Sequence, residues 1–465
     1  MRNIKFLIPQ NLNIDEIIKE NKSDYMTHPF RKEKLLFVCD ALIKARISQR
    51  KEMEQNNTDY ANLSSSILQF VIRDYNTYLQ FLLAAKVMIC NRHFKVGKFC
   101  MGYKFNPAYV GQPLKEVSVE NYILKKRIRL YRISRKKEIK KNTWGYSYLT
   151  KWFDCKKLSI DKKSAFRWID DYEKSKIEVL KTSGSYSDLG LLNILDTARD
   201  FKSLIVRIEN TDYHYAFSGA GHRFYSPLTN LKRELKQFLT FDGQKIVSID
   251  IKNSQPFLSL ALFKHDFWGK KKGKLRLESL NREIYNTIRN KEEYKSIITL
   301  VNTSETLTDI NSGLEKYRSL VLEGLFYEYI QEYFADTYPE RFSDRPRVKK
   351  EVMRILFSDP KKEHWSFYKP CLDFYKHFPV PYQLFKMIKQ IEYNYFPIIL
   401  QAIESFLVID VICKRISDLN AEIPIFTIHD NILTTIGNEG FVASIMTEEI
   451  KGYIGHTPTL DIQYL

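Results

Sequence analysis

The chain has 465 residues, of which 44% are hydrophobic and 28% are charged, and its formal net charge is +18. This composition excludes general disorder, and the length predicts roughly two to four domains. No apolar run approaches the roughly 18 residues of a membrane span, and the N-terminus lacks a signal-peptide pattern. The six cysteines form no Cys-x-x-Cys pair, so we expect no zinc module and no disulfide framework. We therefore expect a cytoplasmic protein without a membrane partner.

The first 205 residues are predicted to be mainly helical. Residues 1–90 carry amphipathic helix patterns, and residues 91–160 give no clear assignment. Residues 160–210 are helical again, with a soft linker at 182–190 that is rich in Gly and Ser.

Positive charge is concentrated between residues 86 and 141, where 16 basic residues accompany three acidic ones. Clustered cations gain free energy by releasing the counterions condensed on nucleic acid, so we expect a polyanionic partner. The alternatives are a solvated helix face and adhesion to an anionic membrane. The residues expected to contact nucleic acid are Lys125, Lys126, Arg127, Arg129, Lys136 and Lys137.

Two short strand patterns in the second half of the chain each carry an aspartate. The segment 246–251 (IVSIDI) is rich in β-branched residues and contains Asp250. The segment 423–436 is typical of a hairpin with Asp430 in its polar turn. Residues 270–400, between the two, are predicted to be mostly helical.

Carboxylates at strand ends can hold magnesium ions over a substrate phosphate. Two such ions about 4 Å apart activate the attacking oxygen and stabilise the leaving one. Magnesium commonly takes one or two protein carboxylates, with water and phosphate completing its shell. Taken singly, each aspartate is more typical of an ordinary structural or turn position.

A helix is predicted to begin at Asp344 and to end before Pro360. Four of its side chains recur every four residues and therefore form one ridge along the helix. The ridge consists of Arg345, Lys349, Met353 and Phe357. Its cationic end is suited to a triphosphate and its apolar end to a nucleotide base. The alternative is an amphipathic helix whose ridge is merely solvated.

Four motifs, in order along the chain, resemble those of single-subunit nucleic-acid polymerases: the family A DNA polymerases and the bacteriophage- and mitochondrial-type RNA polymerases. The ridge resembles motif B, residues 246–255 (IVSIDIKNSQ) resemble motif A, and residues 427–431 (TIHDN) resemble motif C. Upstream, residues 222–231 (HRFYSPLTNL) resemble the family A element R-x-x-S-x-x-x-N-L. The resemblance covers roughly residues 210–465 and leaves residues 1–200 unassigned.

The resemblance implies a magnesium-dependent catalytic site. Asp250 and Asp430 would hold two Mg²⁺ ions, for which Mn²⁺ is an alternative, and the backbone carbonyl of Ile251 would be a further ligand. Lys349 would be catalytic as well, because it would neutralise or protonate the leaving pyrophosphate. The residues implied to bind the nucleotide are Arg345, Lys349, Met353, Phe357 and Gln255, the last of which matches motif A approximately. Those implied to bind the primer–template are Arg223, Asn230 and His429.

The departures from the family patterns concern the choice of sugar. Family A DNA polymerases carry a Glu soon after the motif A Gln, and this Glu excludes the ribose 2′-hydroxyl; here Pro256 follows. The motif B aromatic residue is usually a Tyr, and here it is Phe357. We therefore expect weak sugar discrimination.

Motif C also departs from the family A pattern. Asn431 stands where motif C of family A has a Glu, so no third carboxylate is expected there. Glu404 is equally compatible with a nucleic-acid-facing and an exposed helix position.

The fold predicted on this basis is mixed α/β with a right-hand arrangement. A basic helical N-terminal region of thumb-like character would span residues 1–205. A palm with a small antiparallel sheet would span 206–265 and 401–465, and helical fingers would span 266–400.

The predicted function is a template-directed, DNA polymerase-like nucleotidyltransferase without a proofreading exonuclease. Its partners would be a DNA or RNA primer–template and nucleoside triphosphates, and the sequence leaves its oligomeric state open. An RNA polymerase or primase, a template-independent transferase, a non-catalytic replication protein and a metal-dependent nuclease are the alternatives.

Overall fold

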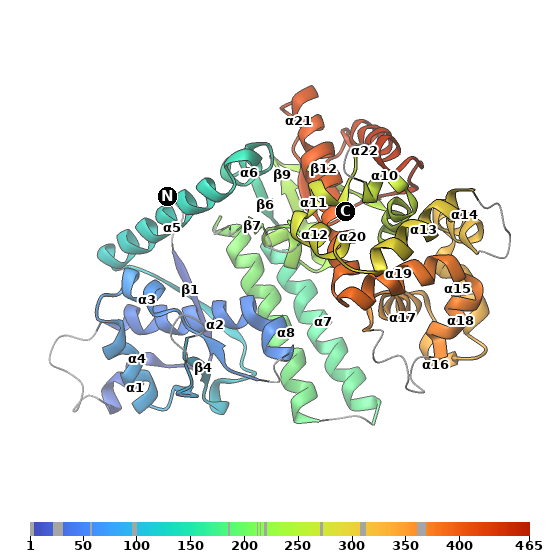
Figure 1. Cartoon of the computed structure of the whole chain (residues 1–465). Coiled ribbons are helices and arrows are strands. Elements are labelled where there is room, and N and C mark those ends of the chain that lie inside the picture. Colours follow the sequence, from blue (N-terminus) through green and yellow to red (C-terminus); the bar gives the residue numbers. More distant parts are fainter. Residues whose placement is uncertain are drawn as a thin grey trace. The chain divides into compact units, whose positions relative to one another are not determined.

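The computed structural model describes residues 4–21, 31–55, 58–94, 100–184, 187–211, 213, 215–217, 221–269, 273–306, 313–359 and 369–465. The protein is mixed α/β, mostly helical, with small antiparallel sheets (Figure 1). The chain passes back and forth between two compact units. Unit 1 comprises Met1–Trp144, Ser159–His214 and Leu231–Phe238, and unit 2 comprises Gly145–Leu158, Tyr215–Asn230 and Leu239–Leu465.

Unit 1 combines long helices with a two-stranded and a three-stranded sheet of short strands. Its helices are α1 (Ile14–Glu20), α2 (Lys32–Gln55), α3 (Ser65–Val71), α4 (Tyr75–Ala84), α5 (Tyr122–Asn142), α7 (Lys162–Thr182) and α8 (Asp188–Glu209). Its strands are β1 (Lys5–Pro9), β2 (Ala61–Asn62), β3 (Met88–Cys90), β4 (Gly102–Phe105) and β5 (Leu114–Ser118), and β6 (Leu158–Ile160) lies at the boundary between the units. Short 3₁₀ turns occupy Pro107–Tyr109 and Arg233–Phe238.

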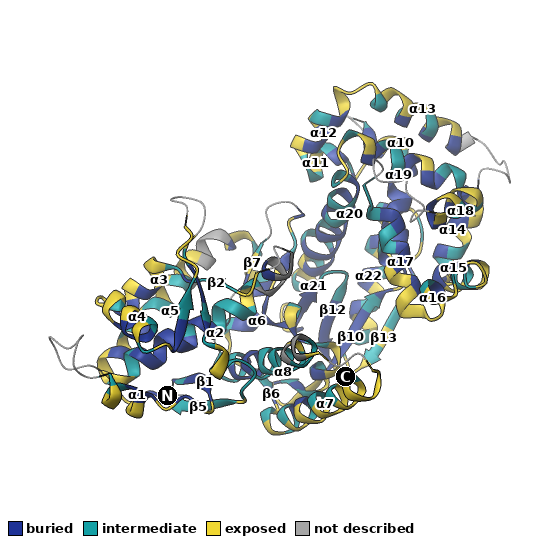
Figure 2. Cartoon of the chain, turned by 90° about the horizontal axis from the view of Figure 1, so that it is seen from below, coloured by how far each residue is buried: buried dark blue, intermediate teal, exposed yellow. Residues whose placement is uncertain are grey.

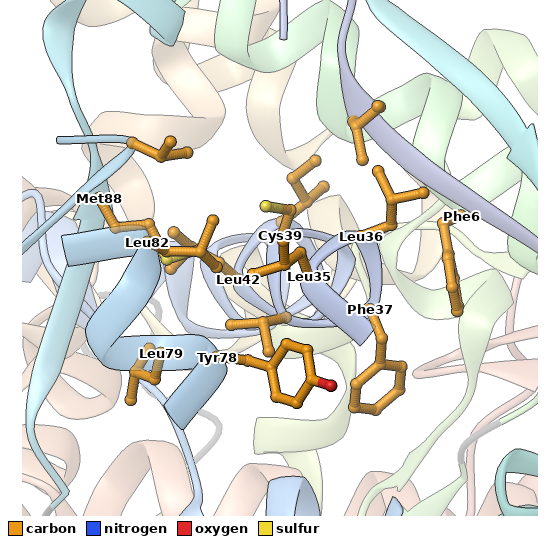
Figure 3. Packing of buried hydrophobic residues seen from close by; sticks show 14 of the residues in the cluster. Phe6, Leu35, Leu36, Phe37, Cys39, Leu42, Tyr78, Leu79, Leu82 and Met88 are labelled. Atoms are coloured by element: carbon orange, nitrogen blue, oxygen red, sulfur yellow. The ribbon is translucent and has the colours of Figure 1, made fainter. Parts of the chain in front are cut away.

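The core of unit 1 forms around α2. Leu35 and Cys39 of this helix are fully buried, as are Phe6 of β1 and Leu82 of α4 at its sides (Figure 3). Burial of such side chains is the main favourable contribution to folding. The helices predicted before residue 90 and after residue 160 are confirmed, and the region between them contains α5. Strand β1 was not predicted, because its five residues are too short to display a strand period.

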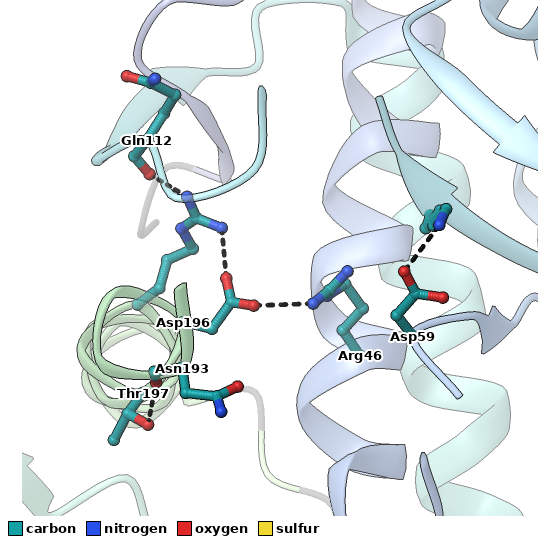
Figure 4. A network of polar contacts seen from close by, with 8 residues as sticks. Arg46, Asp59, Gln112, Asn193, Asp196 and Thr197 are labelled. Carbon is teal, nitrogen blue, oxygen red and sulfur yellow. Dashed lines mark hydrogen bonds and ion pairs between the residues drawn. The ribbon is translucent and has the colours of Figure 1, made fainter. Parts of the chain in front are cut away.

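An ion-pair network joins α8 to α2 in unit 1. Asp196 of α8 accepts hydrogen bonds from Arg46 at 2.9 Å and from Arg199 at 2.8 Å (Figure 4). Arg199 also donates to the backbone carbonyl of Gln112. Because all three ionic side chains are largely shielded, this network holds the two helices in one position better than exposed ion pairs would.

Unit 2 contains the remaining elements. Its helices are α6 (Ser147–Asp154), α9 (Ser254–Leu258), α10 (His265–Trp268), α11 (Leu277–Leu280), α12 (Arg282–Arg289), α13 (Glu293–Thr306), α14 (Leu314–Glu323), α15 (Phe326–Phe334), α16 (Pro339–Phe342), α17 (Arg345–Phe357), α18 (Lys369–His377), α19 (Pro379–Ile391), α20 (Tyr395–Ser405), α21 (Lys414–Leu419) and α22 (Glu439–Ile454). Its strands are β7 (Ala216–Phe217), β8 (Phe224–Tyr225), β9 (Leu239–Phe241), β10 (Gln244–Ile251), β11 (Phe426–Ile428), β12 (Asn431–Thr435) and β13 (Leu460–Tyr464). Short 3₁₀ turns occupy Pro227–Asn230 and Ser259–Phe263.

Strand β10 is central to the sheet of unit 2. It pairs antiparallel with β12, with Ile249 opposite Ile432, and with β13, with Asp250 opposite Asp461. It also pairs with β9 through a tight turn, and β12 pairs with β11. The predicted strand and hairpin are confirmed. The sheet is larger than predicted, because β9 and β13 belong to it as well.

Helix α20 continues through a π-helical segment, Phe406–Cys413, into α21. The whole helix Tyr395–Leu419 is long and apolar enough to cross a membrane, so the prediction that no apolar run approaches this length was wrong. However, 67% of its apolar window is buried inside the protein, as expected of a core helix (Figure 2). Its apolar character is thus explained by packing against other elements of unit 2.

Candidate active site

The two candidate aspartates come from neighbouring strands of the unit 2 sheet. Asp250 lies near the C-terminal end of β10. Ile428 pairs with Asn431, so His429 and Asp430 form a two-residue turn between β11 and β12. Because β12 runs antiparallel to β10, this turn lies at the end of β10 that carries Asp250.

Asp430 and Lys349, which come from two other segments, lie within electrostatic reach of Asp250 at this end of the sheet. Burial, followed by the negative charge of Asp430, raises the pKa of Asp250 to about 7. The positive charge of Lys349 lowers the same pKa, although less strongly. Perturbed carboxyl groups of this kind are common in catalytic sites, where like charges are brought together.

The chemistry of the aspartate pair fits magnesium. The Oδ1 atom of Asp250 is buried and accepts no hydrogen bond from any described residue, so it offers a lone pair to a cation. No cluster of three or more His, Cys, Asp or Glu side chains that could hold a metal occurs among the described residues. A pair of carboxylates suits Mg²⁺, which needs one or two, better than zinc. The backbone carbonyl of Ile251 remains a predicted ligand.

The predicted helix of the ridge is confirmed as α17. Asp344 caps its N-terminus by accepting a hydrogen bond from the backbone N–H of Arg347 at 2.9 Å. The buried face consists of Val348, Glu351, Val352, Ile355 and Leu356. Lys349 lies outside this face and is exposed. The ridge is therefore solvated at its cationic end, but it also places the charge of Lys349 within electrostatic reach of Asp250.

Helix α15 supports the cationic end of the ridge. The Nε atom of Arg345 donates to Glu328 at 2.8 Å, and the guanidinium lies 5.7 Å from the ring centre of Tyr327. Burial raises the pKa of Tyr327, while Arg345 lowers it and Asp430 raises it further. Tyr327 thus lies beside Arg345 and within electrostatic reach of Asp430.

The apolar end of the ridge joins the helical core. Met353 and Phe357 are half-buried. The ring centre of Phe357 lies 5.9 Å from that of Phe396, which in turn lies 4.5 Å from that of Phe385. Contact of Phe357 with a nucleotide base remains a prediction.

A buried carboxylate joins two of the other predicted site residues. Glu404 of α20 is 1% exposed, and its Oε2 atom accepts hydrogen bonds from Arg223 and from Gln255, both at 2.7 Å. Burial and then the charge of Asp430 raise the pKa of Glu404 to about 7, whereas Arg223 lowers it. The sequence was compatible with a nucleic-acid-facing and an exposed helix position for Glu404, and its burial excludes the exposed position.

Left-handed backbone conformations border three segments of the site. Among the described non-glycine residues, His222, Asn253 and His429 have φ of 51°, 53° and 59°. They precede Arg223, Gln255 and Asp430 by one or two positions. Such conformations cost free energy and concentrate at functional sites. The side chain of Asn253 is buried as well, and its polar atoms have no hydrogen-bond partner among the described residues.

The predicted primer–template residues are not all in the same environment. The ring of His429 makes an edge contact with that of Tyr225, with the ring centres 5.7 Å apart. Arg223 is 17% exposed because it is engaged by Glu404. Asn230 is exposed at the end of a 3₁₀ turn.

The predicted basic residues belong to α5 in unit 1. Leu124 and Ile128 anchor this helix in the core of that unit. Lys126 and Lys137 are exposed, and Arg127 donates to the backbone carbonyl of Val71 at 3.3 Å. Lys125 and Arg129 are half-buried, and the side chain of Lys136 lies outside the described part of the chain. The helix therefore offers cations to solvent while its apolar side is buried.

Sequence reasoning missed two features of the site. Tyr327 and Glu328 contact Arg345 from another helix, and nothing in the sequence pattern relates these segments. Asp461 lies directly opposite Asp250 and contributes to its raised pKa. The alternation of polar and apolar residues in 460–464 (LDIQY) could have identified this strand.

No protein-family model matches the chain, and no protein of curated function does. Among solved structures, the chain is similar to the POL domain of Pol1 from M. smegmatis in complex with DNA primer–template and dNTP. The similarity covers 68% of this chain and 69% of that one, with 12% identity and a TM-score of 0.30. At this distance the activity of the solved protein does not transfer to this chain.

Proposed function

We propose that the protein is a magnesium-dependent, template-directed nucleotidyltransferase that resembles a DNA polymerase. The observation that carries the proposal is that Asp250 of a strand and Asp430 of a hairpin turn lie at the same end of the sheet, with the charge of Lys349 of α17 within electrostatic reach of Asp250. Two acids and a cation at a sheet end are the groups that phosphoryl transfer requires.

Each side chain has a definite part in this proposal. Asp250 and Asp430 would hold two Mg²⁺ ions, which supply activation of the attacking 3′-oxygen and charge stabilisation when bound. Lys349 and Arg345 would bind the triphosphate, and Lys349 would neutralise the leaving pyrophosphate. Arg223 would hold the primer–template near its growing end.

The proposed architecture assigns a role to each region. Residues 206–265 and 401–465 would form the palm, residues 266–400 the fingers, and residues 1–205 a basic region that grips nucleic acid. An RNA polymerase, a primase and a template-independent transferase would use the same groups. A non-catalytic replication protein is the second candidate, because the exposed cations of α5 would serve it equally well.

Primer extension tests the proposal directly. Purified protein is incubated with Mg²⁺ and a labelled primer on DNA and RNA templates, with separate dNTP and rNTP pools. We expect extension that EDTA abolishes. We expect the efficiencies of rNTP and dNTP incorporation to differ by less than about tenfold, because Pro256 replaces the Glu that excludes the 2′-hydroxyl and Phe357 replaces Tyr.

Two results would contradict these expectations. A sugar preference above about a thousandfold, roughly 4 kcal/mol, would refute weak discrimination. Tight binding of nucleic acid without extension on any template would favour the replication protein instead.

The exposed cations of α5 should determine how binding responds to salt. Replacing Lys126 and Lys137 by Ala is expected to weaken binding of single-stranded or duplex DNA about tenfold. The slope of log affinity against log salt concentration should fall by roughly 1.5, because two phosphate contacts are lost. Fluorescence anisotropy at several salt concentrations measures both quantities. The matched control replaces Lys163 and Lys174, which are exposed on α7, and an equal effect there would show that only total charge matters.

A further inference from the structure

The carboxylate of Glu404 is bound by two donors from different motifs. Arg223 belongs to the segment that resembles the primer–template element, and Gln255 lies five residues after Asp250 on α9. Both donors contact the same oxygen atom at 2.7 Å. The two donor nitrogens are therefore no more than about 5.4 Å apart, which is twice this bond length.

The backbone that carries Arg223 is held by contacts other than those of Glu404. A side chain at Gly221 would approach Gln401 of α20 to 2.9 Å, so this segment packs directly on the helix that carries Glu404. His222 is held through a 2.7 Å hydrogen bond between its Nε2 atom and the hydroxyl of Tyr146. With the backbone held, Glu404 determines where the head group of Arg223 points.

The ion pair between Glu404 and Arg223 is shielded from water. Glu404 is 1% exposed and Arg223 is 17% exposed, so neither charge is compensated well by water. Removing one member of such a shielded pair leaves the other charge without compensation, and that group then moves or draws in water. A change at Glu404 would consequently displace both donors together.

We propose that Glu404 is a positioning residue that couples the two substrates of the reaction, by fixing the primer–template contact of Arg223 to the nucleotide contact of Gln255. The inference rests on the proposed function. Successive nucleotides of one strand are about 3.4 Å apart along the axis. Two donors within about 5.4 Å of each other are thus spaced to contact the primer terminus and the incoming nucleotide, which are such neighbours.

Single-nucleotide incorporation by Glu404→Gln tests this coupling. We expect the KM for the nucleotide and the Kd for the primer–template to rise about tenfold together, with kcat within about threefold of the wild type. In a Gln255→Ala background, Glu404→Gln should change the nucleotide KM less than threefold, because the coupled donor is already absent. The matched control is Glu392→Gln, an exposed carboxylate beyond the end of α19, which should change neither constant.

A purely structural role predicts a different pattern. It would lower the melting temperature and the active fraction, leave KM and Kd unchanged, and give independent effects in the double variant; this pattern would overturn the proposal. Should Glu404→Gln fail to fold, Arg223→Lys tests the same coupling from the partly exposed side. A raised nucleotide KM in that variant supports the coupling, and an effect on primer–template binding alone refutes it.

The failure of the proposed function would be recognised separately. If the wild-type protein incorporates no nucleotide but binds a fluorescent primer–template, anisotropy with and without dNTP measures whether each substrate strengthens the other. Loss of this mutual effect in Glu404→Gln supports the coupling. Persistence of the effect in Glu404→Gln, or its absence in the wild type, refutes the coupling. A wild-type protein that binds neither substrate would refute both proposals.

Discussion

Replacing Asp250 by Asn is expected to lower the rate of primer extension at least about 10³-fold. The same replacement is expected to make the folded protein more stable against unfolding. The loss follows because a metal-holding carboxylate supplies several kcal/mol of charge stabilisation, and each 1.36 kcal/mol is a factor of ten in rate. The gain follows because Asp250 is half-buried beside Asp430 and its pKa is raised to about 7. Removing one of two facing charges should increase the free energy of unfolding by about 1–3 kcal/mol at pH 8.

The gain in stability should depend on pH with a definite sign. The folded pKa of Asp250, about 7, lies above its ordinary value of 3.8, so the folded state binds more protons than the unfolded state between these values. The wild type therefore loses stability as the pH rises through this window, whereas Asn does not titrate. The difference between the two proteins should be small near pH 4 and complete above pH 7.

Thermal unfolding with and without Mg²⁺ measures this effect apart from activity. Magnesium should raise the melting temperature of the wild type at pH 8 and have a smaller effect on Asp250→Asn. The control is Asp242→Asn, a carboxylate in the turn before β10 that pairs with Lys157 at 2.7 Å on the surface. Extension within tenfold of the wild type in Asp250→Asn, or an equal response to Mg²⁺ in both proteins, would contradict the metal assignment.

Replacing Lys349 by Ala should lower the rate of extension about 10²- to 10³-fold. A cation directed at the charge that develops on a transferring phosphoryl group contributes this much in comparable sites. Lys349 also lowers the pKa of Asp250. Its loss should therefore raise that pKa further and move the acidic limb of the kcat/KM profile to higher pH.

The adjacent residue provides the control for this prediction. Lys350 is exposed on the same helix, about 100° further around it. Steady-state kinetics between about pH 6 and pH 9 on Lys349→Ala, Lys349→Arg and Lys350→Ala would compare the three. An equal loss of rate in Lys350→Ala would mean that the helix contributes only general positive charge. If the acidic limb does not shift in Lys349→Ala, Lys349 does not influence the pKa of Asp250.

The sequence was informative where local patterns determine the structure. The capping of α17 by Asp344, the strand that carries Asp250 and the hairpin that carries Asp430 follow from short-range signals. Each of these elements was predicted within a few residues of its bounds.

The sequence was less informative where contacts join distant segments. Glu404 reads equally well as an exposed residue, because its burial depends on Arg223 and Gln255, which lie 181 and 149 residues away. The position of Tyr327 beside Arg345 likewise depends on the packing of α15 against α17. Such contacts leave no trace in local periodicity, so the ion pair between Arg223 and Glu404 was visible only in the structure.

The pairing of β10 also has a consequence for how the protein is made. Both β12 and β13 lie roughly 200 residues after β10 in the chain. At a synthesis rate of about 5–20 residues per second, β10 leaves the ribosome about 10–40 s before these partners. During this interval its apolar edges have neither neighbour, which makes the nascent chain prone to wrong pairing. A ribosome-associated chaperone that covers β10 during this delay should therefore increase the yield of soluble protein.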